Sequence, residues 1–200
     1  LNNESINWEG GHHSIEKMKG IRLVVKSPGI PLGSKVIQAL IKSGSTIISE
    51  IEFASQFTSA TLIGITGTNG KTTTTLLTYE ILKKAGLNVG IAGNIGKSFA
   101  LQVAQSDFDY YVLEISSFQL DNIQDFAPHI TLITNITPDH LDRYNYSLNK
   151  YKDAKLRITK NQTARDFFLF NADDSILKEA IQNQQIVAKK IPFGFNNITE

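Results

Sequence analysis

Residues 64–72, Gly-Ile-Thr-Gly-Thr-Asn-Gly-Lys-Thr, combine closely spaced glycines with one lysine and the start of a threonine run. The apolar residues 61–66 predict a strand before this stretch, and residues 72–84 predict a helix after it. A helix N-terminus binds anions through its free amide groups and its dipole, and glycines let phosphate oxygens approach the backbone. Lys71 could reach terminal phosphates, and the Thr72 hydroxyl could contact Mg²⁺. The stretch therefore predicts a phosphate loop for ATP, made of Thr68, Asn69, Gly70, Lys71, Thr72, Thr73 and Thr74.

This loop is a variant of the general phosphate-loop motif. The motif G-x-x-x-x-G-K-[ST] requires a glycine five residues before Gly70, where the chain has Ile65. The alternative is a glycine-rich turn with a surface lysine, but the flanking strand and helix favour the phosphate loop. A phosphate loop alone suits a kinase, a GTPase, a motor or a ligase. No N-K-x-D-type sequence for reading guanine is present, which argues against a GTPase.

Two further polar residues stand at the ends of apolar segments. Glu114 lies at the end of the apolar residues 110–116, where α/β sheets bind ligands, and could hold Mg²⁺ directly or through water. His140 follows the apolar residues 129–135, and a neutral imidazole can bind a metal or a substrate carboxylate. A structural turn histidine is the alternative, although aspartates at 139 and 142 make a cation site more plausible.

Alternating strands and helices are expected to position these residues. Apolar, β-branched runs predict strands, and residues spaced three to four apart predict helices. This alternation predicts an α/β fold with a parallel sheet, and a domain junction near residue 50. The expected strands are 21–25, 46–49, 61–66, 88–93, 110–116, 129–135 and 166–171, and the expected helices are centred on 36–41, 72–84, 147–160 and 175–184.

The overall composition is that of a soluble globular protein. Of 200 residues, 41% are hydrophobic and 20% charged, and the net charge of +1 gives no reason to expect a nucleic-acid partner. The absence of cysteine excludes disulfides and a thiolate zinc site. No apolar run reaches the ~20 residues of a membrane span. We therefore expect a cytoplasmic protein that does not bind a membrane. We also expect a monomer.

Five ordered motifs resemble the Mur ligase family, with matching spacing from about residue 20 to residue 175. The resemblance implies an ATP-dependent amide ligase of peptidoglycan synthesis that uses Mg²⁺ and joins D-glutamate to UDP-N-acetylmuramoyl-L-alanine through an acyl phosphate. The alternatives are another Mur ligase, a folylpolyglutamate synthetase, or a nucleotide-binding module without catalysis. The motifs are the phosphate loop, GNIG (93–96), LEISSFQL (113–120), NITPDHLDRY (135–144) and YKDAKLRI (151–158).

The resemblance also implies roles for individual residues. Lys71, His140 and Lys155 would be catalytic, and Mg²⁺ would be bound by Thr72, Glu114, His140 and a carbamate on Lys155. The substrate would contact Ser27, Pro28, Gly29, Asn94, Ser116, Gln119 and His140. From the sequence alone Lys155 looks solvated, because the same helix has lysines at 150, 152 and 160. A carbamate needs the neutral amine, so burial would have to lower the pKa of Lys155.

Family members with this activity have three domains. By the resemblance, residues 1–50 are the C-terminal part of a Rossmann-like UDP-binding domain. Residues 51–200 are an incomplete central ATP-binding domain of the phosphate-loop type. The C-terminal domain, with the residues for D-glutamate, is absent, so we expect these 200 residues alone to be catalytically inert.

Overall fold

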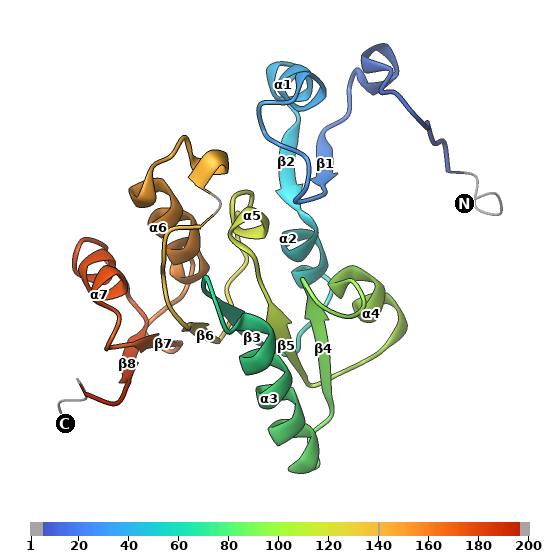
Figure 1. Cartoon of the computed structure of the whole chain (residues 1–200). Helices are drawn as coiled ribbons and strands as arrows, with labels where there is room; N and C mark the ends of the chain where they lie inside the picture. Colours follow the sequence, from blue (N-terminus) through green and yellow to red (C-terminus); the bar gives the residue numbers. More distant parts are fainter. Residues whose placement is uncertain (1–5, 140, 197–200) are drawn as a thin grey trace.

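The computed structural model describes residues 6–139 and 141–196, which form two parallel sheets. The small sheet pairs β1 (Leu23–Lys26) with β2 (Thr46–Ser49) and lies at one end of the molecule, together with α1 (Lys35–Lys42) (Figure 1). The large sheet has the order β4-β5-β3-β6-β7-β8, and every neighbouring pair is parallel. Its strands are β3 (Thr61–Thr66), β4 (Val89–Gly93), β5 (Tyr110–Glu114), β6 (Ile130–Ile133), β7 (Phe167–Asn171) and β8 (Lys189–Phe193). The expected α/β fold with a parallel sheet is confirmed.

Helices cover both faces of the large sheet because its central strands are apolar on both sides. On one face, α3 (Lys71–Lys84) packs through Tyr79 and Leu82 on Ile63, Ile65 and Val112. The opposite face carries the larger core, with Leu62, Leu113, Ile133 and Phe168 against the other helices. These helices are α2 (Glu50–Ser55), α4 (Phe99–Gln105), α5 (Ser117–Leu120), α6 (Leu148–Leu156) and α7 (Ser175–Gln182).

Several elements were not predicted from the sequence. The helices α2, α4 and α5 have six, seven and four residues, too few to show a helical period. Strand β8 contains two lysines and a proline, which suit its position at the edge of the sheet but hide its strand character. Three short 3-10 helices complete the described chain: η1 (Ile15–Met18), η2 (Leu141–Tyr144) and η3 (Arg157–Thr159).

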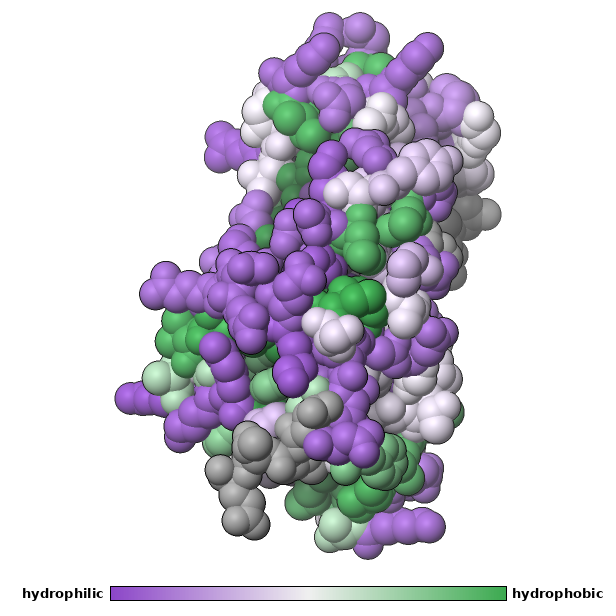
Figure 2. Space-filling model, turned by 60° about the vertical axis from the view of Figure 1, so that its left-hand side comes forward, coloured by the Kyte–Doolittle hydropathy of each residue, from purple (hydrophilic) through white to green (hydrophobic). Residues whose placement is uncertain are grey.

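The face of the molecule in Figure 2 is largely hydrophilic, with apolar patches between the polar side chains. Among residues 6–139 and 141–196, every helix is too short or too polar to span a lipid bilayer.

The helix α2 stands between the two sheets in the chain and carries the buried carboxylate of Glu52, which is 0% exposed. Its oxygens accept hydrogen bonds from the backbone amides of Gln124 (2.9 Å), Asp125 (3.1 Å) and Phe126 (2.9 Å). A buried carboxylate that satisfies three amides is expensive to remove, because the amides lose their partners. The segment after α5 is therefore held against α2 by one side chain.

We expect Glu52→Ala to lower the free energy of unfolding by about 3 kcal/mol, because three backbone amides lose their acceptor and the amide of Phe126 is buried. Urea denaturation of this chain measures the change. Glu80→Ala, which removes an exposed glutamate on α3, is the matched control and should change it by less than ~0.5 kcal/mol. Equal effects of the two substitutions would show that Glu52 is not a structural anchor.

Candidate active site

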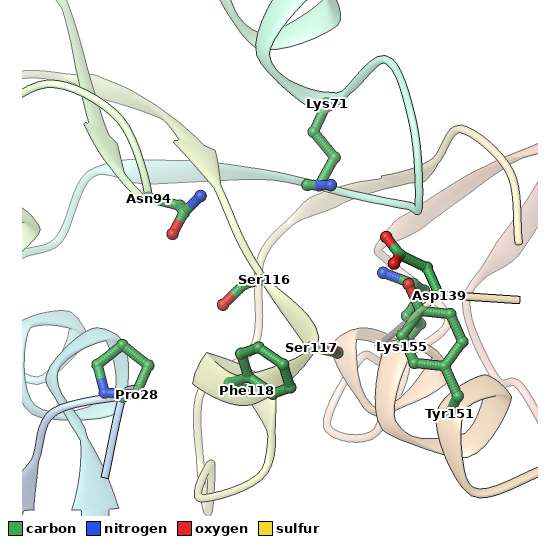
Figure 3. A pocket seen from close by; sticks show the side chains of 10 residues that line it. Pro28, Lys71, Asn94, Ser116, Ser117, Phe118, Asp139, Tyr151 and Lys155 are labelled. Atoms are coloured by element: carbon green, nitrogen blue, oxygen red, sulfur yellow. The ribbon is translucent and has the colours of Figure 1, made fainter. Parts of the chain in front are cut away.

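The candidate site lies at the carboxyl edge of the large sheet, between β3 and β6. These neighbouring strands are followed by connections that run in opposite directions, β3 through α3 to β4 and β6 through α6 to β7. In parallel α/β sheets, ligands bind at such a switch point. The loops after β3, β5 and β6 meet here, and Figure 3 shows their side chains around one cavity.

The loop after β3 has the backbone conformation of a close ligand cradle. Gly67 has φ +144°, and a Cβ at this position would lie 1.9 Å from Thr134 Oγ1, so only glycine fits. The amides of Thr68 and Asn69 donate to the backbone oxygen (2.9 Å) and the side-chain oxygen (3.0 Å) of Asn135. The segment after β6 thus fixes the shape of the loop, and α3 begins directly behind it at Lys71.

The Lys71 ammonium group lies over its own loop. Its Nζ donates to the carbonyl oxygens of Gly67 (3.0 Å) and Thr68 (2.7 Å), which places a cation at the start of α3. The Thr74 hydroxyl donates to Gly70 O (2.8 Å) and so is directed back into the helix, whereas Thr73 is exposed. A ligand phosphate could replace the carbonyl oxygens as the partner of Lys71, because a charge-assisted hydrogen bond to an anion is stronger.

Glu114 connects three segments of the site. This carboxylate is 2% exposed. It accepts hydrogen bonds from Thr72 Oγ1 (2.7 Å) and from Asn94 Nδ2 (2.8 Å). The predicted metal residues Thr72 and Glu114 therefore touch, and Asn94 from the loop after β4 is bound to the same carboxylate.

Lys155 is buried, contrary to the sequence-based interpretation of a solvated lysine. Its side chain is among the largest fully buried ones, and the residue is 2% exposed. Its Nζ donates to Gly67 O (2.6 Å) and lies 4.6 Å from the centre of the Tyr151 ring. Burial, and secondly the positive charge of Lys71, lower the pKa of Lys155 to about 7, while Asp139 opposes the shift. A sizeable fraction of neutral amine is therefore expected near neutral pH.

The neighbouring lysines of α6 differ from Lys155. Lys150 is exposed, as predicted. Lys152 is 8% exposed and forms an ion pair with Glu179 (3.2 Å), so the expectation that it is solvated is wrong. Within α6, Lys155 is the lysine that contacts the phosphate loop.

Two residues that the sequence reading left without a role also shape the site. The Tyr151 hydroxyl lies 3.2 Å from Thr68 Oγ1, and it links α6 to the phosphate loop. Asp174 accepts from the amide of Ile136 (2.6 Å) and from that of Leu177 (2.9 Å), so it caps α7 and fixes the segment after β6. An aspartate directly before a helix is a common N-cap, which was a usable sequence signal for Asp174. His140 lies outside the described residues.

Four of the predicted substrate residues, Pro28, Gly29, Asn94 and Ser116, share a cavity with Lys71 of the phosphate loop. The cavity measures about 340 Å³, and Pro28 and Gly29 line one side of it. In Figure 3, Pro28 lies across from Lys155 and Tyr151, with Ser116 and Phe118 between them. The full lining set is Pro28, Gly29, Lys71, Asn94, Ser116, Ser117, Phe118, Asp139, Tyr151 and Lys155.

The structure gives Gln119 and Ser27 supporting positions. Gln119 is 5% exposed, and its Oε1 accepts from the backbone amide (2.9 Å) and the hydroxyl (3.1 Å) of Ser116. It therefore holds Ser116 in place at the start of α5. The carbonyl oxygen of Ser27 accepts from Lys26 Nζ (3.0 Å).

The site is that of a nucleotide-binding protein of the phosphate-loop class. Strand β3 leads into a glycine loop with a lysine at the start of the next helix, and a carboxylate ends the neighbouring strand. The Mur ligase middle domain matches residues 65–199, and the chain belongs to the Mur ligase family.

Curated relatives extend over nearly the whole chain. The UDP-N-acetylmuramoylalanine–D-glutamate ligase of Bacteroides fragilis is 54% identical over 194 residues, which are 97% of this chain and 44% of the relative. The ligase of the same name from Christiangramia forsetii is 46% identical over 200 residues, 100% of this chain and 45% of the relative. The chain thus spans less than half the length of these relatives.

Solved structures confirm the fold. The crystal structure of MurF ligase from Thermotoga maritima in complex with ADP matches with a TM-score of 0.58 and 19% identity, over 88% of this chain and 51% of that chain.

Proposed function

We propose that this chain contains the ATP-binding site and part of the acceptor-substrate site of an ATP-dependent ligase that adds D-glutamate to UDP-N-acetylmuramoyl-L-alanine. The observation that carries this proposal is the shared cavity, in which Lys71 and Lys155 face Asn94, Ser116 and Pro28. A phosphate donor and a substrate carboxylate would meet there. The names of the two curated relatives support the choice of substrates.

Nucleotide binding is supported by the loop geometry. The cation of Lys71 and the N-terminus of α3 suit the outer phosphates of ATP. The MurF structure is a complex with ADP, which supports a nucleotide as the ligand of this fold.

The donor set also fits Mg²⁺. The hydroxyl of Thr72 and the carboxylate of Glu114 are adjacent oxygen ligands, and Mg²⁺ usually takes one or two protein oxygens together with phosphate oxygens. When bound, Mg²⁺ would neutralise charge on the phosphates of ATP. We propose that a carbamate on Lys155 is a further oxygen ligand of Mg²⁺, since the buried amine is partly neutral near pH 7. His140 remains a candidate ligand from the sequence.

We expect Glu114→Ala to raise the Mg²⁺ concentration that half-saturates turnover by about 10–100-fold, because a carboxylate ligand is lost. Mg²⁺-dependent ATP binding should shift in parallel, which gives a readout besides turnover. Glu80→Ala on α3 is the control. An unchanged Mg²⁺ titration would remove Glu114 from the metal site.

The chemistry requires two transfers. The substrate carboxylate attacks the γ-phosphorus, a new P–O bond forms, the bond to the β-phosphate oxygen breaks, and ADP leaves. The amine of D-glutamate then attacks the acyl carbon, the C–O bond to phosphate breaks, and the amine loses a proton as inorganic phosphate departs. Lys71 and the amides of the loop would stabilise the charge on the transferred group.

The domain division remains part of the proposal. We assign residues 1–50 to a UDP-binding domain and residues 51–200 to the central domain. The separate small sheet and the match of the middle domain to residues 65–199 support this division. Because the curated relatives are more than twice as long, we propose that activity belongs to the full-length gene product.

Phosphate release by the full-length product tests the proposed reaction. Release should require ATP, UDP-N-acetylmuramoyl-L-alanine and D-glutamate together. Other amino acids and folate acceptors test the alternative ligases, and they should give only the ATP background. Release that does not depend on D-glutamate would contradict the proposal.

A further inference from the structure

The turn at residues 27–30 has a conformation that its sequence does not enforce. The amide of Ile30 donates to Ser27 O (3.1 Å), which closes a β-turn with Pro28 and Gly29 at its centre. Proline followed by glycine suits type II, in which the glycine has φ near +80°. Gly29 is not among the described glycines with positive φ, so the turn is not type II. Types I and II differ by a flip of the central Pro28–Gly29 peptide.

One distant arginine holds that peptide. Arg143 Nη2 donates to Pro28 O (3.2 Å) from η2, 115 residues along the chain. Its guanidinium carbon lies 4.5 Å from the centre of the Phe118 ring, and Phe118 stacks with Tyr144 at 6.0 Å. The Phe118 ring therefore positions the guanidinium group, which binds the carbonyl oxygen of Pro28. A flip of the Pro28–Gly29 peptide would turn this oxygen away from Arg143.

The carbonyl groups at the two ends of the turn are bound by Lys26 and not by Arg143. Lys26 Nζ donates to Ser27 O (3.0 Å) and to Ile30 O (2.9 Å), and Lys26 is 5% exposed. These bonds fix both ends of the turn and leave the orientation of the central peptide to Arg143.

The orientation decides what the turn presents to the cavity. Pro28, Lys26 and Arg143 line a second cavity of about 440 Å³. Gly29 lines the candidate active-site cavity, with Pro28 between the two. A trans peptide directs its N–H opposite to its C=O. With Pro28 O directed toward Arg143, the Gly29 N–H is directed to the other side, where an anionic group of the substrate would accept from it.

We infer that Arg143 is a positioning residue that selects the turn orientation in which Gly29 N–H binds the anionic part of the UDP-linked substrate. This inference rests on the proposed function, and it adds a residue that acts through the backbone of the turn. Arg143 also joins η2 to the turn, so binding of this substrate and the position of the segment after β6 are coupled.

The test uses the full-length product. Arg143→Ala should raise KM for UDP-N-acetylmuramoyl-L-alanine about tenfold, the effect of losing roughly one charge-assisted hydrogen bond, and leave KM for ATP within about twofold. Arg143→Lys keeps the charge and should recover part of the affinity. The control is Arg165→Ala, which removes an exposed arginine and should change neither constant.

A second substitution separates orientation from general structure. Alanine disfavours positive φ, and a Cβ at Gly29 meets no atom within 4 Å, so Gly29→Ala should hold the turn out of type II without Arg143. In a Gly29→Ala background, Arg143→Ala should then raise KM for UDP-N-acetylmuramoyl-L-alanine by less than about threefold. Amide NMR gives an independent readout, because the flip strengthens the Overhauser effect between Pro28 Hα and Gly29 H in Arg143→Ala.

Any one of three results would overturn the inference about Arg143. These are equal increases in KM for ATP and for UDP-N-acetylmuramoyl-L-alanine, an increase in the latter that is as large in the Gly29→Ala background, and an unchanged Overhauser effect. A wild-type product without D-glutamate-dependent turnover would overturn the proposed function, and with it the substrate named here.

Discussion

Lys71→Ala is expected to reduce ATP-dependent turnover of the full-length product by at least about 10²-fold, the usual loss when one preorganised donor to a transferring group is removed. The described structure places the Lys71 ammonium 3.0 Å from Gly67 O and 2.7 Å from Thr68 O, directly over the loop. Lys155, the other lysine at this loop, is buried with a pKa of about 7 and so carries less charge. ATP affinity, measured by calorimetry, should fall with turnover.

Lys84→Ala is the control for this prediction. Lys84 lies in the last turn of the same helix and is exposed, so its removal should leave turnover unchanged. Turnover of Lys71→Ala within tenfold of the wild type would mean that the loop does not hold the transferred phosphate.

Lys155→Ala is expected to lower turnover by about 10–100-fold, the range for a lost ligand or its support. In the structure, the Nζ is buried against Gly67 O, where a carbamate would lie beside the phosphate loop. Added acetate should restore part of the activity by supplying the missing oxygen ligand. ¹³C-labelled carbon dioxide should give a carbamate signal in the wild type and none in Lys155→Ala.

The dependence on pH and carbon dioxide follows from the neutral amine. Below a pKa of about 7 the amine is increasingly protonated, so turnover should fall as the pH drops through this value and in buffers without carbon dioxide. Lys150→Ala is the matched control, because Lys150 is exposed on the same helix. If Lys155→Ala keeps the activity of Lys150→Ala, the carbamate assignment is wrong.

The sequence predicted the parts of the fold whose signals are local. Strand β3 and helix α3 follow from an apolar run, a glycine turn and a helical stretch, and β3 was predicted with its observed bounds. The helix α2 was missed because its stability comes from tertiary contacts such as the bonds of Glu52. The helix α5 begins at the Ser116–Gln119 capping box, a local signal that was available in the sequence, but its four residues are too few to show a helical period. Short segments of this kind have no sequence period of their own.

The site residues likewise divide into those with a local sequence signal and those placed by tertiary contacts. Lys71 and Glu114 stand in motifs next to strand ends, so their proximity followed from the parallel sheet. The burial of Lys155 depends on contact with Gly67, 88 residues away in the sequence, and the four lysines between 150 and 160 look alike without that contact. The link from Arg143 to Pro28 joins η2 to the turn at residues 27–30 and could not be read from either segment alone.

The central claim is that the carboxylate of one substrate takes up the γ-phosphate of ATP before the amide forms. Transfer of ¹⁸O tests it most directly, in the full-length product with UDP-N-acetylmuramoyl-L-alanine labelled in its alanyl carboxylate, ATP and D-glutamate. An acyl phosphate passes one carboxylate oxygen to inorganic phosphate when the amine displaces it. We therefore predict one ¹⁸O in each phosphate released, whereas unlabelled phosphate formed together with the amide would contradict the account.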